Sequence, residues 1–464
     1  MTKKSASAQS VTAKSLPVHL SSEAGFAKIA KLLSPAARQF SEGMGFAAKS
    51  GAMLVVPGTD GKPEAALFGT GSDEGLADNP FLAGKLATDL PPGRYHLAGK
   101  VAKPQLVYLA FLLGKYRFSR YRKHDLRDVT LDAPEGCDAA TIERTAEIIC
   151  MGRDLINTPA NDLTTADLAA AAKALAKAHK AKFKEIVGDD LLEENFPLIH
   201  AVGKASAVPP RLVDIRWGAT DAPKVTLVGK GVVFDTGGLD LKTSASMLLM
   251  RKDMGGAATA LTTAALIMAS GINVRLRVLL PIVENAVSGL SFRPGDIYPS
   301  RKGITVEIGN TDAEGRLILA DALTLADEEK PDLLVDFATL TGAARVALGP
   351  ELPPFYTDDE ALAAEIARIS GETHDPVWRM PLWKPYQAML DSKYADTNNT
   401  GASGFAGSIT AALFLKRFVS DTSAYAHFDI YGWNPSAKPG KPEGGEPQAA
   451  RLVAALVAKR FAQK

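Results

Sequence analysis

The sequence predicts an α/β protein with a smaller α/β N-terminal domain and a larger C-terminal domain, in which a mixed sheet forms the middle of three α/β/α layers. The chain has 464 residues, more than one hydrophobic core usually serves. From about Lys182 onward, apolar runs of strand length alternate with segments of helix length. Such alternation is typical of a parallel or mixed sheet with helices on both faces.

The first 137 residues are expected to form the smaller domain, with residues 1–17 as a mobile tail. Their clearest core segments are the apolar runs 52–57 and 105–113. The second run fits a strand or a helix equally well, because short apolar runs do not distinguish the two. Since no group of residues of catalytic type stands out in this part, we expect it to have a non-chemical role.

A linker helix is expected over residues 138–160, followed by the larger domain over residues 161–464. Apolar residues recur at helical spacing in the linker, and Thr164 is a capping residue for a further helix that extends to about Lys182. In the larger domain we expect strands over residues 225–229, 274–283, 332–340 and 426–430, and helices over residues 255–270, 316–329 and 447–461.

The overall composition argues against several classes of protein. The formal net charge of +1 provides no global field that would favour nucleic acid or an anionic membrane. The chain has no apolar run of about 18 residues, and its first 20 residues lack the apolar core of a secretory signal. Two cysteines, Cys137 and Cys150, are too few for a disulfide framework and fit a reducing compartment, so we expect a cytoplasmic protein.

Four carboxylates lie in apolar or glycine-rich surroundings: Asp235, Asp253, Asp312 and Glu314. Asp235 lies where a predicted buried strand enters a turn, the place where sites gather in open α/β sheets. Asp253 lies at the start of a predicted helix. An acid in that position more often stabilises the helix N-terminus than binds a metal. Asp312 and Glu314 would share a face if their segment is extended, but the pattern fits first-turn acids of a helix equally well. On local grounds both interpretations stay open.

If these carboxylates bind metal, the ligands are mostly oxygen atoms. None of the seven histidines lies in these segments, so Mg, Mn or carboxylate-bound Zn suits them best. Crowded carboxylates repel one another unless cations lie between them, and two divalent ions about 3.5–4 Å apart are a standard hydrolytic arrangement. Lys230, between two glycines, could bind a neighbouring ion as a neutral amine, whereas Lys242 and Arg316 could stay cationic and stabilise negative charge.

Together these segments resemble the leucyl aminopeptidase family, the M17-type metallo-exopeptidases. The resemblance covers roughly residues 138–464, and its most specific motif is NTDAEGRL at residues 310–317. The other matching segments are residues 157–163, 228–238, 253–258, 293–296 and 338–343, with Lys242 between them. This resemblance implies an aminopeptidase of the EC 3.4.11 type, which removes the first residue from peptides with a free N-terminus.

The resemblance also implies a role for each site residue. Asp235 and Glu314 would bridge two divalent ions (Zn or Mn, with Mg possible). Lys230 and Asp253 would complete one ion's ligands, and Asp312 the other's. Lys242 would stabilise the oxyanion, and Arg316 would hold a bicarbonate that shuttles the proton. Residues that contact the substrate or line the pocket for its first side chain would be Met250, Thr339, Leu340 and Gly342. The family further implies a homohexamer of two stacked trimers.

Two residues depart from the family pattern, and other functions remain to be weighed. Asp240 is an extra acid before Lys242, and Thr243 stands where proline is common, so substrate preference near Lys242 is open. Another dinuclear-metal amidase or phosphoesterase would use the same carboxylates without recognising an amine. An accessory DNA-binding regulator is disfavoured by the near-neutral charge and the lack of a clear helix-turn-helix. A member that has lost activity is disfavoured by the complete ligand set.

Overall fold

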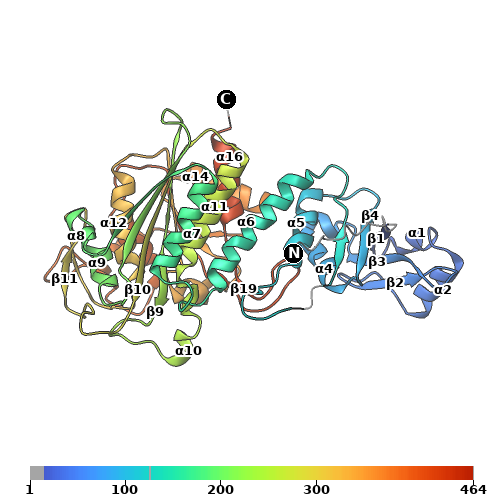
Figure 1. Ribbon diagram of the computed structural model, residues 1–464, viewed down its shortest axis with the longest axis horizontal. Coiled ribbons are helices and arrows are strands. Elements are labelled where there is room, and N and C mark those ends of the chain that lie inside the picture. The colour runs from blue at the N-terminus through green and yellow to red at the C-terminus, as the bar shows by residue number, and fades with distance from the viewer. Residues whose placement is uncertain (1–14, 125–126, 463–464) are drawn as a thin grey trace, which may run out of the picture. The chain divides into compact units, whose positions relative to one another are not determined.

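The computed structural model describes residues 15–124 and 127–462 and divides them into two compact units (Figure 1). The first unit contains the residues up to Glu147 together with Ala437–Pro442, and the second contains Ile148–Ser436 and the residues from Glu443 onward. Most of the expected N-terminal tail lies outside the described residues. Its last residues, Leu16 and Pro17, belong to strand β1 (Leu16–Ser22).

The first unit has the expected α/β character. In the described residues its sheet has five strands, in the order β2 (Met53–Pro57), β3 (Pro63–Gly71), β1, β4 (Gly93–Ala98) and β5 (Val129–Leu131). Its helices are α1 (Phe26–Ala30), α2 (Pro35–Gly43), α3 (Gly75–Asp78), η1 (Pro80–Gly84), α4 (Lys85–Asp89) and α5 (Pro104–Gly114). The ambiguous run 105–113 is therefore a helix. It begins with a proline at its first position, where proline is well tolerated, and buries Val107, Leu109 and Phe111.

Helix α6 (Ala139–Asn157) contains the division between the units, which falls after Glu147. The next helix, α7 (Thr165–Ala178), begins with a capping box in which Thr164 and Asp167 bond each other's backbone N–H groups. The prediction that this helix extends to about Lys182 is wrong. Strand β6 (Lys182–Val187) begins there and pairs with its neighbour β7 (Arg211–Trp217), so sheet pairing outweighs the helical preference of the alanine- and lysine-rich sequence.

The sheet of the second unit is mixed, as predicted. Within the described residues it has nine strands, in the order β15 (Trp378–Arg379), β14 (Pro354–Tyr356), β17 (Tyr425–Asp429), β13 (Leu333–Ala338), β8 (Lys224–Gly229), β10 (Arg275–Asn285), β7 and β6, with β9 (Gly231–Asp235) also paired to β10. Strands β17, β13, β8, β10 and β9 are parallel, whereas β14 and β7 are antiparallel to their inner neighbours.

Helices cover both faces of this sheet, which confirms the three-layer prediction (Figure 1). One face carries α7, α11 (Gly255–Ser270), α14 (Glu360–Thr373) and α16 (Ala450–Arg460), and the other carries α9 (Pro197–Gly203), α12 (Gly315–Asp327) and α15 (Gly407–Lys416). Each face has its own apolar core. On β8, for example, Val225 and Leu227 pack into one core and Val228 into the other, as the alternation of side chains along a strand requires.

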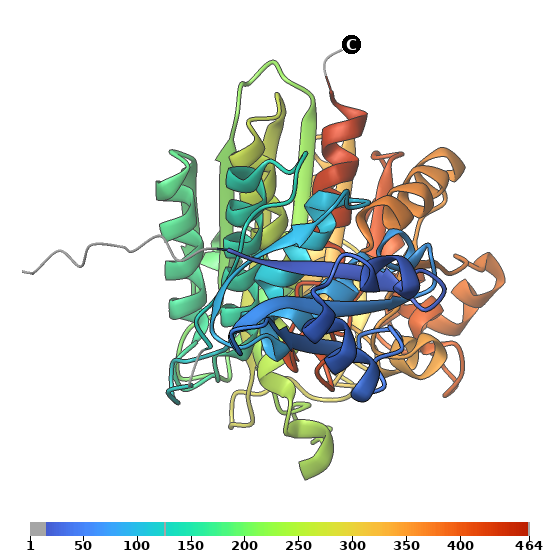
Figure 2. The same ribbon diagram turned by 90° about the vertical axis from the view of Figure 1, so that its right-hand side faces the viewer.

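Shorter elements surround the sheet. They are α8 (Asp190–Glu193), α10 (Ser244–Met247), η2 (Met250–Met254), β11 (Ile297–Pro299), β12 (Thr305–Glu307), α13 (Gly342–Leu348), η3 (Lys384–Leu390), β16 (Thr397–Asn398), β18 (Trp433–Asn434) and β19 (Gly444–Gly445). Helix α10 projects from the rest of its unit in both views (Figure 2). Among the described residues, no helix has both the length and the apolar character needed to cross a membrane.

The strand ends determine where polar side chains gather. Because β8, β9, β13 and β17 are parallel members of one sheet, their carboxyl ends meet at one edge. Lys230 follows β8, Asp235 ends β9, Thr339 follows β13 and Asp429 ends β17.

Candidate active site

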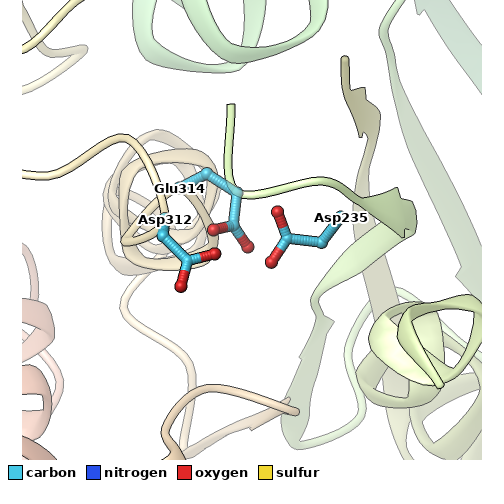
Figure 3. Close-up of side chains that lie close together, drawn as sticks. All are labelled: Asp235, Asp312 and Glu314. Atoms are coloured by element: carbon cyan, nitrogen blue, oxygen red, sulfur yellow. The ribbon is translucent and has the colours of Figure 1, made fainter. Parts of the chain in front are cut away.

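Three carboxylates converge at this edge of the sheet. One oxygen atom from each of Asp235, Asp312 and Glu314 lies within 4.8 Å of the others, and the three side chains point toward one another (Figure 3). Asp235 and Glu314 are buried, with 2% and 1% of their surfaces exposed, and Asp312 is half-buried. Glu314 is the residue from which α12 begins, and Asp312 lies in the turn before it, so the two are neither an extended pair nor acids inside the helix.

Two lysines lie against the carboxylates. Lys230 Nζ lies 2.8 Å from Asp253 Oδ2 and 2.9 Å from Glu314 Oε1, and it donates a 2.8 Å hydrogen bond to the Thr339 carbonyl. Lys242 Nζ lies 2.8 Å from Asp235 Oδ2 and also contacts Asp312. Side chains from residues 230–253 and from residues 312–314 thus form one charged cluster.

Every residue that the sequence predicts for the site lines a single pocket of about 570 Å³. The pocket holds the five predicted metal ligands, Lys242 and Arg316, and the four predicted substrate contacts Met250, Thr339, Leu340 and Gly342. It also holds residues that the sequence did not point to, among them Lys252, Arg345 and Tyr431.

The carboxylates resist being ionised together. Burial and the neighbouring Asp235 raise the pKa of Glu314 to about 8 and the pKa of Asp312 to about 6. Burial also opposes ionisation of Asp253, but the positive charges of Lys230 and Lys252 outweigh it and hold its pKa below the usual value. Burial lowers the pKa of Lys230 and Lys242, yet their carboxylate neighbours outweigh it and raise both pKa values well above the ordinary value.

The absence of a side chain at Gly315 makes room for Lys230. A Cβ atom at position 315 would lie 2.5 Å from Lys230 Cε and 2.7 Å from Lys230 Nζ, distances at which atoms collide. The glycine of the NTDAEGRL motif is therefore required by the lysine that crosses over the start of α12, since any larger residue would displace it from Glu314.

Two buried asparagines that the sequence did not indicate hold the acidic loops in place. Asn285 donates from Nδ2 to Asp235 Oδ1 (2.8 Å) and to the Thr311 carbonyl (3.1 Å). Asn399 accepts from the Gly309 N–H (2.8 Å) and donates to the Asn310 carbonyl (2.8 Å), and its own carbonyl accepts from Arg316 Nη1 (2.6 Å). Both asparagines are completely buried, which indicates that they support the site. The sequence alone does not show this burial.

The two residues that depart from the family pattern also have local contacts. Asp240 Oδ2 accepts a hydrogen bond from the Thr311 N–H at 2.7 Å, and the Asp240 N–H donates to Thr311 Oγ1 at 2.8 Å. The turn just before Asp240 contains Gly237 and Gly238 at φ values of +88° and +66°, a conformation that glycine adopts readily. Thr243 caps α10 by accepting from the Ser246 N–H. Asp240 thus ties the loop that carries Lys242 to the loop that carries Asp312.

Asp429 holds the segment that follows β13. Its Oδ1 accepts from the N–H groups of Leu340 and Thr341, each at 3.1 Å, and its Oδ2 accepts from Thr341 Oγ1 at 2.6 Å and from Ser408 Oγ at 3.1 Å. All of these contacts are buried or partly buried, so the wall of the pocket at Leu340 is fixed by backbone hydrogen bonds.

Comparison with known proteins agrees with this geometry. The model of the cytosol aminopeptidase family catalytic domain matches residues 150–457, and that of the M17 aminopeptidase N-terminal domain matches residues 16–134. The chain is 35% identical over 455 residues to the probable cytosol aminopeptidase of Chlorobium limicola, covering 89% of this chain and 90% of that protein. A relative from Chlamydia abortus is 44% identical over 295 residues, and the match spans 62% of this chain and 59% of that protein.

Solved structures show the same fold. A crystal structure of cytosol aminopeptidase from Coxiella burnetii superimposes with a TM-score of 0.92 at 44% identity, covering 97% of this chain and 98% of that one. The bottromycin maturation enzyme BotP, in complex with Mn, superimposes with a TM-score of 0.87 at 32% identity, covering 97% and 100%. The fold, both domain matches and these relatives lead to one conclusion: the chain belongs to the M17 cytosol aminopeptidase family.

Proposed function

We propose that this protein removes the N-terminal residue from peptides by metal-dependent hydrolysis. The observation that carries the proposal is the convergence of Asp235, Asp312 and Glu314 in one pocket that also holds Lys242 and Arg316. Family membership supports the same reaction.

The residues present fit a pair of divalent ions. Asp235, Asp253, Asp312 and Glu314 would hold the ions through their carboxylates, and Lys230 would complete the set as a neutral amine, after giving up its proton. The oxygen atoms of the three clustered carboxylates lie within 4.8 Å of one another, and the raised pKa values of Glu314 and Asp312 reflect crowded negative charge that cations would relieve. Oxygen-rich donors suit Mn, Mg or carboxylate-bound Zn. When bound, such ions supply Lewis acidity that lowers the pKa of a water molecule toward neutrality.

Lys242 would stabilise negative charge on the carbonyl oxygen of the first residue. Its ammonium is held at the carboxylate cluster by Asp235 and Asp312, and their negative charge keeps it protonated at neutral pH. A fixed cation at the position where charge develops lowers the barrier without reorganising during the reaction.

Arg316 would hold a bicarbonate that carries the proton. The guanidinium is 8% exposed and lines the pocket, and its Nη1 atom donates to the Asn399 carbonyl. In the described part of the chain its buried Nε atom has no hydrogen-bond partner, and no carboxylate lies within ion-pair distance of it. A buried guanidinium with an unused donor favours a small anion as its partner.

A test of the proposal compares leucyl p-nitroanilide with its N-acetylated form, using the protein loaded with Zn²⁺ or Mn²⁺. An aminopeptidase requires the free amine, so only the free substrate should be cleaved. Equal cleavage of both would indicate an amidase without amine recognition, and cleavage of a phosphate ester in place of both would indicate a phosphoesterase.

We also propose that the protein acts in the cytoplasm as a homohexamer. The names of its relatives and its low content of two cysteines support the location. Four large apolar side chains within two residues of ones that line the pocket support a partner surface, since each is at least 62% exposed in the single chain: Leu241, Leu248, Val346 and Phe405. Light scattering should then give about six times the chain mass of 49.0 kDa. A monomer mass would contradict the hexamer.

A further inference from the structure

Lys252 is a buried cation in the pocket without an anionic partner. It lies in η2 beside Asp253 and lines the pocket, yet only 6% of its surface is exposed. Lys230 and Lys242 in the same pocket each contact two carboxylates. Among the described residues, the side chain of Lys252 has no hydrogen bond and no carboxylate within ion-pair distance, and its Nζ atom lies 4.8 Å from the centre of the Tyr431 ring.

The two acids whose charges act on Lys252 are already engaged. Asp253 pairs with Lys230 and accepts from Thr339 Oγ1 at 2.8 Å. Asp429 accepts from two backbone N–H groups and two hydroxyl groups in the wall of the pocket. Both acids attract Lys252 electrostatically, but neither touches it. An ammonium removed from water without a paired anion is costly, so the site is suited to an anion that enters with a ligand.

A second cation faces the same ring. The Arg345 guanidinium lies 5.2 Å from the Tyr431 ring centre, and its Nη1 atom lies 3.4 Å from the Tyr431 hydroxyl. Arg345 lines the pocket and, within the described residues, pairs with no carboxylate. Lys252 and Arg345 repel each other, and an anion between them would relieve that repulsion.

We propose that Lys252, assisted by Arg345, recognises a carboxylate on the side chain of the substrate's first residue, so that peptides beginning with Asp or Glu are substrates. Both cations share the pocket with Met250, Leu340 and Gly342, which are proposed to line the site for that side chain. The inference rests on the proposed aminopeptidase function and adds the class of side chain that the pocket selects.

The first experiment compares kcat/KM for glutamyl and glutaminyl p-nitroanilides with the metal-loaded wild-type protein. The two substrates have nearly the same shape and differ in side-chain charge, and neither carries another carboxylate. A charge-assisted hydrogen bond to Lys252 should favour the glutamyl substrate by about 10- to 100-fold. A ratio of one or below would overturn the proposal.

The second experiment repeats the ratio with Lys252→Met, which keeps the length of the side chain and removes its charge. We expect the ratio to fall to about one in Lys252→Met and to recover in part in Lys252→Arg. Lys177→Met, on the exposed face of α7, is the matched control and should keep the wild-type ratio. A wild-type ratio in Lys252→Met would exclude Lys252 as the recognising group. If that variant does not fold, the wild-type ratio and the calorimetry described next decide the question.

A binding measurement does not depend on turnover. Isothermal titration calorimetry on the metal-loaded wild-type protein should give a Kd for free glutamate about 10-fold or more below that for free glutamine. Equal Kd values would count against the proposal. If leucyl, glutaminyl and glutamyl substrates all fail to react with any metal, the aminopeptidase function fails, while the Kd ratio still tests the carboxylate site.

A short peptide also carries a carboxylate at its C-terminus. A further experiment distinguishes this carboxylate from one on the side chain of the first residue. Leu-Gly and Leu-Gly amide should show the same sensitivity to Lys252→Met if the site reads the first side chain. A loss confined to Leu-Gly would show that Lys252 binds the C-terminal carboxylate and would overturn the assignment.

Discussion

At the scale of single residues, the site depends on lysines that pair with carboxylates within a largely buried cluster. Lys230 bridges Asp253 and Glu314, and Lys242 bridges Asp235 and Asp312. Each lysine therefore joins carboxylates from different loops. This pairing distinguishes them from Lys252, whose charge is left for a ligand to balance.

Replacing Lys242 with alanine tests its role in the reaction. The substitution removes the cation proposed to stabilise the oxyanion, and kcat for leucyl p-nitroanilide should fall by roughly 10²–10³-fold. Lys177→Ala is the control. Lys177 lies on the exposed face of α7 and does not line the pocket, so the variant should keep wild-type kcat. An unchanged kcat in Lys242→Ala would remove this lysine from the mechanism.

The raised pKa of Glu314 predicts how the metal-free protein responds to pH. The group titrates near 4.5 when unfolded and near 8 when folded, so between these values the folded state binds the additional proton. The free energy of unfolding should therefore fall as pH rises from about 5 to 8. Urea denaturation of chelator-treated protein measures it, and Glu314→Gln, which cannot titrate, should lose less stability across the interval. Equal losses in both proteins would contradict the assignment.

The charged residues that the sequence proposed as metal ligands and catalytic groups line one pocket, but the sequence pointed neither to Lys252 and Arg345 in that pocket nor to the residues that support it. Asp312 and Glu314 were ambiguous locally and became interpretable through Lys230, Asp235 and Asp253 elsewhere in the chain. Asn285, Asn399 and Asp429 could not be found in this way, because their role depends on contacts across the fold, such as the bond from Asn399 to the Asn310 carbonyl, 89 residues away. The lack of an anionic partner at Lys252 is likewise a property of the folded pocket.

At the scale of elements, apolar runs predicted the central strands and helices well. Helix α11 has the bounds expected for it, and β8, β13 and β17 each differ from expectation by a few residues at most. Strand β7 was not evident, because Arg211, Asp214 and Arg216 interrupt its apolar residues. These charges are compensated by ion pairs, among them Arg277 with Asp214 at 2.7 Å, which no local pattern reveals.

Asp240 offers a test of how the loops are held together. Asp240→Ala removes the acceptor of the Thr311 N–H, a group on a fully buried residue, and should lower the free energy of unfolding by about 1–3 kcal/mol. We also expect weaker activity, because the loops that carry Lys242 and Asp312 are no longer joined. Asp240→Asn keeps an acceptor oxygen and should retain most of both properties. If Asp240→Ala matches the wild type in urea and in turnover, the link between the loops has no importance.

At the scale of the whole molecule, the chemistry belongs to one of the two units. All the residues proposed for metal binding and catalysis lie in the unit that begins at Ile148, at the carboxyl edge of its mixed sheet. The alternation of strand and helix patterns predicted that architecture, since such alternation has few stable solutions. The first unit was predicted only as an α/β domain, because its apolar runs are short and separated by glycine and proline.

The central claim is that the carboxylate cluster binds two divalent ions on which peptide hydrolysis depends. Its most direct test is to remove metal with a chelator, return Zn²⁺ or Mn²⁺ in measured amounts, and follow both bound metal and cleavage of leucyl p-nitroanilide. We predict no activity in the metal-free protein, recovery that saturates at two ions per chain, and loss of this stoichiometry in Glu314→Gln. Full activity without metal, or the same stoichiometry and activity in Glu314→Gln, would contradict the account.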